Sequence, residues 1–283
     1  MARWRLDAAA LTHRGILRTD NEDNFYLNGR WLSLAAMPHG GRMLMESGAA
    51  FQLYAVCDGL GGEAAGELAS HEAAQALGAL QATHLNGLTD AELGVALRSL
   101  TDGVACLNPT GDQRTGTTLA ALLWQAGQVR AVNVGDSRVY RLRAGELTQL
   151  SRDHSEVQQM VDLGLMTPFE ARLSPRRHLV TQYLGMDARD AAFHPHLAPP
   201  QPARGDDVYL LCSDGLTDMA EDEAIRRVLA RARTPGEAVD ALVALALDSG
   251  GHDNVTALCV FVRGPKRGGL WARRQRRRQY ADG

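Results

Sequence analysis

The chain has 283 residues, of which 45% are hydrophobic and 22% are charged, as in an ordinary soluble globular protein with enough chain for one large domain or two small ones. Only 5% are aromatic, which argues against a nucleic-acid platform built on aromatic stacking. Residues 263–283 carry eight basic side chains and one acidic one, and removing that +7 from the overall −3 leaves −10 on the first 262 residues. We therefore expect an acidic globular body (1–262) and a basic, disordered tail (263–283); nucleic acid is not an expected partner, although the tail leaves that contact open.

The cysteines and the apolar segments indicate the cellular compartment of the protein. The four cysteines are far apart and lack zinc-ligand or redox spacing: Cys57, Cys106, Cys212 and Cys259. Three of them lie in apolar runs and are expected to be buried thiols. No signal peptide is apparent, and no apolar run approaches the roughly 20 residues of a membrane span. The sequence therefore predicts a cytoplasmic protein without a membrane span.

The first half of the chain predicts strands and then a pair of helices. Strands are expected over residues 3–13, 23–36 and 51–57, a surface loop over 37–49, and helices over 63–84 and 90–107. Three consecutive antiparallel strands should follow over residues 117–124, 129–134 and 139–143.

In the second half, Asp153 and Glu156 form a candidate capping box for a helix that ends near Leu163. The remaining segments are predicted as an irregular stretch over 164–200, strands over 207–212 and 254–262, and helices over 221–231 and 235–248. Strands and helices do not alternate strictly, as they would in a parallel βαβ fold. The order favours an α+β fold with antiparallel sheets and helices grouped on their outer faces.

Four aspartates each lie where an apolar run meets a tight turn: Asp58, Asp136, Asp214 and Asp253. A carboxylate at the end of a buried strand is costly unless it is paired or holds a cation. Few basic residues lie beside these aspartates in the sequence. They therefore suggest strand ends that converge on magnesium, manganese or calcium.

The segment RTDNED (residues 18–23) adds the groups that phosphate chemistry needs. Arg18 can hold a phosphate through two parallel hydrogen bonds, and Glu22 and Asp23 can supply oxygens to a metal or its waters. Two neighbouring cations can share a carboxylate, acidify the water between them and clamp a phosphoryl group. Asp58 is the candidate bridge, because the glycines after it also let a backbone carbonyl approach a cation. Asp214 and Asp253 would complete one metal site, Glu22 and Asp23 would help hold the other, and Asp136 and Asp218 could support an additional cation.

Several other site types fit less well. Residues 59–64 (GLGGEA) match the dinucleotide fingerprint, but Asp58 would face the pyrophosphate and no acid-ended strand follows at the required distance. Cys57, Cys106 and Cys212 have no basic residue in the next six positions, Cys259 is followed by Arg263 only at the end of an apolar run, and neither a P-loop nor a nucleophile elbow is present. Among the scattered histidines, His154 and His178 could approach a phosphate or act as an acid, but a structural or solvent-facing role fits them at least as well.

Six motifs, taken together and in order, resemble those of the metal-dependent (PPM, type 2C) serine/threonine protein phosphatases, especially compact bacterial members. The likeness spans residues 8–262 and rests on RTDNED (18–23), DGLGG (58–62), GTTL (116–119), NVGDSR (133–138), CSDGLTD (212–218) and GHDNVT (251–256). It implies a four-layer α-β-β-α sandwich with two central, mainly antiparallel sheets and a binuclear manganese or magnesium centre at one end.

The resemblance also implies roles for single residues. Asp58, the Gly59 carbonyl, Asp214 and Asp253 would be metal ligands. Glu22 and Asp23 would serve the second metal, Asp136 a third with Asp218 nearby, and Arg18 would bind phosphate. Residues 153–200 would form the flap of bacterial members. One departure is Leu60, which stands where eukaryotic members place a histidine proposed as general acid; another is the stretch 37–50, which looks longer than in the most compact members.

The expected activity is hydrolysis of phosphoserine and phosphothreonine by a hydroxide that bridges two cations, with no phospho-enzyme. Expected partners are phosphorylated proteins, including a cognate serine/threonine kinase, and the expected state is a monomer. Two alternatives stay open: a catalytically silent phosphoprotein-binding module on the same fold, and a hydrolase of small phosphate esters.

Overall fold

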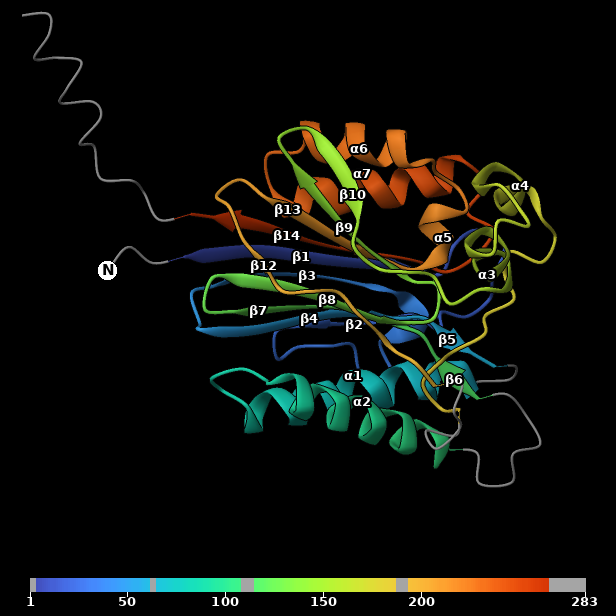
Figure 1. The fold of residues 1–283 in the computed structure, drawn as a ribbon. Coiled ribbons are helices and arrows are strands. Elements are labelled where there is room, and N and C mark those ends of the chain that lie inside the picture. The colour runs from blue at the N-terminus through green and yellow to red at the C-terminus, as the bar shows by residue number, and fades with distance from the viewer. Residues whose placement is uncertain (1–3, 62–64, 108–114, 187–192, 265–283) are drawn as a thin grey trace, which may run out of the picture.

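Two antiparallel sheets stacked face to face form the centre of the protein, and a helix pair covers the outer side of each (Figure 1). The structure is a computed structural model that describes residues 4–61, 65–107, 115–186 and 193–264. Most of the predicted basic tail therefore lies outside the described residues. The predicted four-layer α-β-β-α architecture is confirmed.

The first sheet has six strands. In spatial order they are β10 (Glu146–Gln149), β9 (Arg138–Arg143), β13 (Val208–Cys212), β14 (Val255–Arg263), β1 (Arg5–His13) and β3 (Gly41–Ser47). Its two longest strands, β1 and β14, pair over their full length from Arg5 opposite Arg263 to His13 opposite Val255. The beginning and the end of the described chain thus form the middle of one sheet.

The second sheet runs in the order β11 (His196–Leu197), β8 (Gln128–Val134), β7 (Leu119–Gln125), β4 (Phe51–Cys57) and β2 (Asn24–Leu27), with β12 (Gln201–Pro202) also paired to β8. A separate two-stranded ladder, β5 (Gly59–Leu60) with β6 (Gly116–Thr117), lies at one end of the sandwich. Because β5 directly follows β4, this ladder places the Asp58–Gly59 turn at that end.

Both faces of each sheet are covered, so the central strands are apolar on both sides. In β14, Leu258 and Val260 point into the space between the sheets, whereas Ala257 and Cys259 pack under the outer helices. Cys57, Cys212 and Cys259 are buried free thiols, as predicted, and Cys106 is exposed. Because both faces of these strands are packed, a change of strand register would disrupt the core. The packing therefore also fixes the positions of the aspartates at the strand ends.

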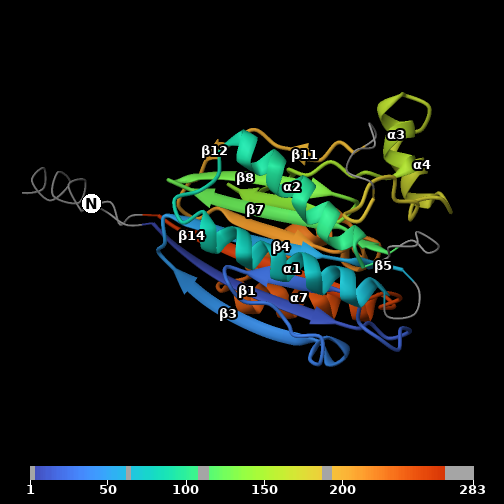
Figure 2. The ribbon, with the colours of Figure 1, turned by 90° about the horizontal axis from the view of Figure 1, so that it is seen from below.

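The helices are α1 (Ala65–Thr83) and α2 (Asp90–Ala105) on the second sheet, α6 (Asp222–Arg231) and α7 (Pro235–Asp248) on the first, and the short α5 (Asp214–Thr217) after β13. Figure 2 shows α1 and α2 across one face and α7 across the other. Local sequence sets where two of these helices begin. Thr89 and Glu92 form a capping box at α2, and Thr234 caps α7, whose first residue is Pro235. No helix among the described residues is long and apolar enough to cross a membrane.

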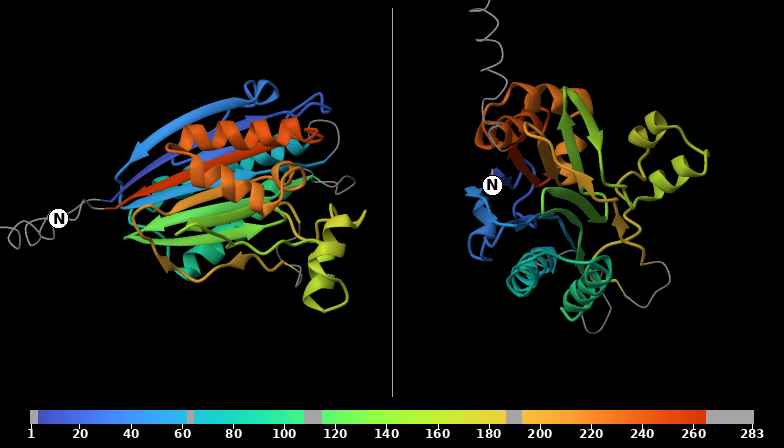
Figure 3. Two further views of the ribbon diagram at one scale, coloured as in Figure 1. Left: turned by 90° about the horizontal axis from the view of Figure 1, so that it is seen from above. Right: turned by 60° about the vertical axis from the view of Figure 1, so that its left-hand side comes forward.

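A small helical unit, α3 (Glu156–Asp162) with α4 (Pro168–Leu173), stands off from one end of the sandwich (Figure 3). We call residues 153–186 that contain it the flap. Its two ends are held together: the Glu156 amide donates to the Leu179 carbonyl at 2.9 Å, and the Thr181 amide donates to the His154 carbonyl at 2.8 Å. The flap is thus anchored at its base, beside the strand ends.

Several predicted segments were wrong in detail. Residues 41–47 form the edge strand β3 rather than a loop, and the strand predicted over 23–36 ends at Leu27, where Asn28 and Gly29 turn with positive φ. Residues 164–200 were predicted to be irregular but include α4 and the short strand β11. Ser155 rather than Asp153 caps α3, because Arg138 engages the Asp153 carboxylate at 2.7 Å. Arg263, assigned to the tail, is the last residue of β14.

Candidate metal centre

The predicted site residues meet at the end of the sandwich that carries β5, α5 and the flap. They surround an open cleft of about 1310 Å³. Eight of the nine predicted site residues line it: Arg18, Glu22, Asp58, Gly59, Asp136, Asp214, Asp218 and Asp253. The ninth, Asp23, lies buried behind the floor of the cleft. Segments up to 231 positions apart in the sequence (from Glu22 to Asp253) thus contribute carboxylates to one site.

The backbone of Asp58 is held from two sides by the GTTL motif. Thr118 accepts from the Asp58 amide through Oγ1 at 3.1 Å and donates its own amide to the Asp58 carbonyl at 2.8 Å, and the Thr117 hydroxyl donates to the same carbonyl at 2.9 Å. Burial, and then the Asp23 carboxylate, raise the pKa of Asp58 well above its usual range. The structure therefore fixes a carboxylate where a negative charge is costly without a cation.

Gly59 lies where a side chain would not fit. A Cβ at this position would come within 2.3 Å of the Gly66 carbonyl oxygen and 2.7 Å of the Glu22 carbonyl oxygen. Only glycine lets the chain pass this close to the first turn of α1 and to the 18–23 segment. The glycines were predicted to let a carbonyl approach a cation, and the structure adds a separate reason for Gly59, which is this close approach to neighbouring backbone.

Asn254 ties the 18–23 segment to the start of β14. Its Oδ1 accepts the Glu22 amide at 2.7 Å, and its Nδ2 donates to the carbonyls of Arg14 and Asp20 at 2.9 and 2.8 Å. The neighbouring Asp253 faces the cleft, as does Glu22. Burial raises the pKa of Glu22. One buried amide side chain thus sets the position of two predicted ligands.

The Asp23 carboxylate sits between two hydroxyl groups. Thr256 Oγ1 and Ser213 Oγ donate to Asp23 Oδ2 at 2.6 and 2.8 Å, whereas Asp23 Oδ1 is buried with no hydrogen-bond partner. Burial raises the pKa of Asp23 to about 7, although both hydroxyls act in the opposite direction. A buried, unpartnered carboxylate oxygen is what a cation or a water bound to a cation would satisfy.

Arg18 reaches across the mouth of the cleft to Asp253. Its Nη2 donates to Asp253 Oδ2 at 2.8 Å, and both side chains are about half exposed (55% and 40%). An exposed ion pair of this kind contributes little to stability. The ion pair instead holds the Arg18 guanidinium beside the predicted metal ligands, where it can also bind a phosphate.

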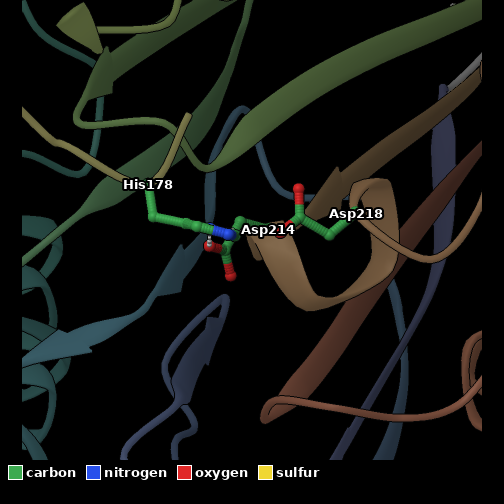
Figure 4. A group of neighbouring side chains, drawn as sticks. All are labelled: His178, Asp214 and Asp218. Atoms are coloured by element: carbon green, nitrogen blue, oxygen red, sulfur yellow. Dashed lines mark ion pairs between the residues drawn. The ribbon is translucent and has the colours of Figure 1, made fainter. Parts of the chain in front are cut away.

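Asp136, Asp214 and Asp218 lie on the side of the cleft that faces the flap. Burial, and then Asp214, raise the pKa of Asp136 well above its usual range. Asp214 opens α5, and the Asp218 amide donates to the Asp214 carbonyl at 2.8 Å, so that the two side chains lie one helical turn apart on the same face. The flap residue His178 approaches both of them (Figure 4).

The donor set fits hard divalent cations. All the predicted ligands are oxygens, and burial makes several of the carboxylates costly to ionise without added positive charge. The predicted ligands Asp58, Asp214 and Asp253 line the same cleft, but their carboxylate oxygens do not all lie within 4.8 Å of one another. Among the described residues, the one trio of side chains whose ligand atoms all lie within 4.8 Å of one another is His178, Asp214 and Asp218. Leu60, in the position of the eukaryotic histidine, also lines the cleft and offers no proton.

Sequence reasoning did not assign the residues that hold the ligands: Thr118, Ser213, Asn254 and Thr256. All four lie inside the quoted motifs, so a signal was present, but their partners are distant in the sequence. His178 was singled out only as a histidine that could approach a phosphate or act as an acid, and nothing in its surroundings along the chain points to Asp214 or Asp218.

Comparisons with known proteins agree with this geometry. A family model described as Protein phosphatase 2C matches residues 43–246. The chain is 38% identical over 257 residues to the serine/threonine protein phosphatase PstP of Mycobacterium tuberculosis, covering 90% of this chain but 44% of PstP, so it spans less than half the length of that relative. It is 32% identical over 255 residues to the serine/threonine phosphatase stp of Listeria monocytogenes, covering 88% of this chain and 93% of stp.

A solved structure shows the same likeness in three dimensions. The catalytic domain of PstP in complex with two manganese ions matches with a TM-score of 0.73 at 36% identity, covering 92% of this chain and 99% of that one.

Proposed function

We propose that this chain, which belongs to the protein phosphatase 2C family, hydrolyses phosphoserine and phosphothreonine esters in proteins with the help of divalent cations. The observation that carries the proposal is the convergence of carboxylates from separate stretches of the chain in one cleft, with Arg18 at its mouth. The two manganese ions of the PstP catalytic domain support manganese as the cation, and magnesium is the alternative with the same ligand preference.

We assign Asp58, Asp214, Asp253 and the Gly59 carbonyl to the cations, with Glu22 and Asp23 helping at the second. Asp136 and Asp218 would serve a further, weaker cation. When bound, the cations would supply charge to the phosphoryl oxygens and make water acidic enough to attack phosphorus near neutral pH.

The chain's own residues bind and orient the ester. Arg18 offers parallel N–H donors to the phosphate and leaves Asp253 free to face a cation. Asn254, Thr117 and Thr118 hold the ligand backbones in place. Leu60 cannot protonate the departing serine or threonine oxygen, so that proton comes from water in the cleft.

The size of the cleft favours a protein substrate over a small ester. At about 1310 Å³ it is larger than the roughly 300–1,000 Å³ of typical small-molecule sites, and it is open along the flap. We take residues 1–262 as the catalytic domain and residues 153–200 as the insert that contains the flap. A cognate serine/threonine kinase among the substrates, a monomeric state and a cytoplasmic location stay predictions.

The test is hydrolysis of a phosphothreonine peptide after chelation and after addition of manganese or magnesium, with p-nitrophenyl phosphate and a nucleotide in parallel. We expect activity only with cation and the highest kcat/KM on the peptide, and we expect Asp58→Asn to abolish turnover. Metal-dependent activity confined to small esters would favour the small-ester hydrolase. Cation-independent phosphopeptide binding without turnover would favour the silent module.

A further inference from the structure

We propose that the flap residue His178 is a nitrogen ligand of a divalent transition-metal ion that Asp214 and Asp218 also hold, so that this ion fastens the flap to the core. The inference rests on the proposed metal centre, because Asp214 and Asp218 both belong to it, Asp218 as a ligand of the further, weaker cation. It goes beyond that centre by adding an imidazole to an otherwise all-oxygen donor set, and by giving the cation a structural partner in the flap.

His178, Asp214 and Asp218 lie close enough together to share one cation. His178 Nδ1 lies 3.2 Å from Asp218 Oδ2 and 3.9 Å from Asp214 Oδ2, and the three ligand atoms all lie within 4.8 Å of one another. Two atoms that each lie about 2.1 Å from one ion at an angle of about 100° are roughly 3.2 Å apart. The His178–Asp218 spacing thus already suits a shared cation, and the Asp214 oxygen, at 3.9 Å, would have to come about 0.7 Å nearer to His178 Nδ1 at the same angle.

Figure 4 shows the imidazole reaching from the flap toward the two carboxylates, which come from successive turns at α5. His178 is half exposed (49%), and Asp214 and Asp218 are less so (24% each). The His178 imidazole therefore lies on the solvent side of the Asp214 and Asp218 carboxylates and presents a nitrogen to both.

The neighbouring Arg177 cannot take the same role. Its Nε lies 3.6 Å from Asp218 Oδ2, but a guanidinium has no lone pair to offer a cation. An imidazole does, and it suits transition ions such as zinc, iron, nickel and copper, whereas magnesium and calcium prefer oxygen ligands. Manganese also favours oxygen, so it tests the imidazole at the weak end of the transition series. The donor set predicts that a transition ion, and not magnesium, draws the flap to the core.

The consequence concerns the flap as a whole. Its base is already pinned by the hydrogen bonds of Glu156 and Thr181, whereas α3 and α4 project outward. A ligand bond from His178, which directly precedes Leu179 at this base, would tie the base to Asp214 and Asp218 at α5. The flap should then be more ordered in manganese than in magnesium.

The test reads the metal directly. Pulsed electron paramagnetic resonance of the manganese-loaded chain should show modulation from a directly bound ¹⁴N nucleus in the wild type. His178→Gln should lose it, and His252→Gln should keep it, because His252 lines the same cleft beside Asp253 without approaching Asp218. His178→Asp should restore cation binding through oxygen but without the nitrogen signal.

Binding and exchange measurements complete the test. We expect His178→Gln to weaken one manganese site by at least ~10-fold and to leave magnesium affinity unchanged. Hydrogen exchange over 156–181 should slow on manganese addition in the wild type but not in His178→Gln. Absence of nitrogen modulation in the wild type, or equal manganese affinity in His178→Gln, would overturn the inference. Neither result depends on phosphatase activity, so phosphopeptide hydrolysis without a nitrogen signal would refute only this inference.

Discussion

The side-chain oxygen of Asn254 accepts the backbone amide of Glu22 at 2.7 Å and so joins segments 232 positions apart. Its nitrogen donates to two further carbonyls of the N-terminal loop, those of Arg14 and Asp20. Asn254 is 7% exposed, so water cannot readily replace these bonds. The pairing explains why Glu22 and Asp253 face the same cleft.

Replacing Asn254 by Ala should destabilise the protein by roughly 2–4 kcal/mol, because three hydrogen bonds are lost and their buried partners stay unpaired. Asn254→Asp keeps the acceptor but loses both donors, and it should fall between alanine and wild type. Denaturant unfolding with manganese present would measure both. Equal stability of the alanine and aspartate variants would contradict the role given to the acceptor.

Thr256→Val should weaken the support of Asp23, since valine keeps the shape but removes the hydroxyl that donates to Asp23 at 2.6 Å and also lies 2.7 Å from the Thr12 hydroxyl. We expect a loss of about 1–3 kcal/mol, as for other hydrogen bonds to a charged group. The measurement is a double-mutant cycle with Asp23→Asn, in which the Thr256 effect should shrink because the charge is gone. Strictly additive effects would show that the two side chains do not interact energetically.

The sequence predicted the carboxylates of the site better than the groups that hold them. Asp58, Asp214 and Asp253 each adjoin a buried strand, which is a local pattern. The hydroxyls of Ser213 and Thr256 find Asp23 only after the chain has folded, over separations of 190 and 233 positions. Serine and threonine are common in sheets, so their type alone carries no signal.

The errors in secondary structure have a similar cause. Asp153 matches a helix cap in the sequence but is claimed by Arg138 from β9, which leaves Ser155 to cap α3. The edge strand β3 could not be predicted from its sequence, because Leu44 on its exposed side stands between the half-buried Met43 and Met45. Apolar and polar residues therefore do not alternate along it, although its burial does. Its pairing with β1, and not its own pattern, makes it a strand.

Arg18→Ala should change substrate binding far more than stability. Its pair with Asp253 is half exposed, so the loss in unfolding free energy should be at most about 1 kcal/mol. Loss of charge-assisted bonds to phosphate should raise KM by roughly 10- to 100-fold. Arg18→Lys should be intermediate, because an ammonium cannot make the parallel pair. Steady-state kinetics on a phosphopeptide would measure these changes. An unchanged KM would show that Arg18 does not bind the phosphate.

Gly59→Ala should cost roughly 3 kcal/mol or more and weaken cation binding, because the new methyl would overlap the backbone of Gly66 and Glu22. The matched control is Gly103→Ala in α2, where a Cβ meets nothing within 4 Å. That change should stabilise the protein by about 0.5–1 kcal/mol through helix propensity. Thermal unfolding separates the two, and similar behaviour of both variants would refute the close-packing explanation.

His154 should make the protein less stable in mild acid. Its Nδ1 accepts the Gly135 amide at 3.1 Å, and burial lowers its pKa from 6.5 to about 4. The unfolded chain therefore binds the proton more readily between these values. The stability contributed by neutral His154 is complete above pH 6.5 and is lost as the pH falls toward 4, by up to about 3 kcal/mol.

Asn at position 154 offers an acceptor in a similar place but does not titrate, so His154→Asn should lack this part of the pH dependence. Other titrating groups are common to both proteins and cancel in the difference between their unfolding free energies. That difference, measured by denaturant unfolding from pH 7 to 4, should change steadily in favour of the variant as the pH falls. A constant difference over this range would show that His154 is not held neutral by its burial.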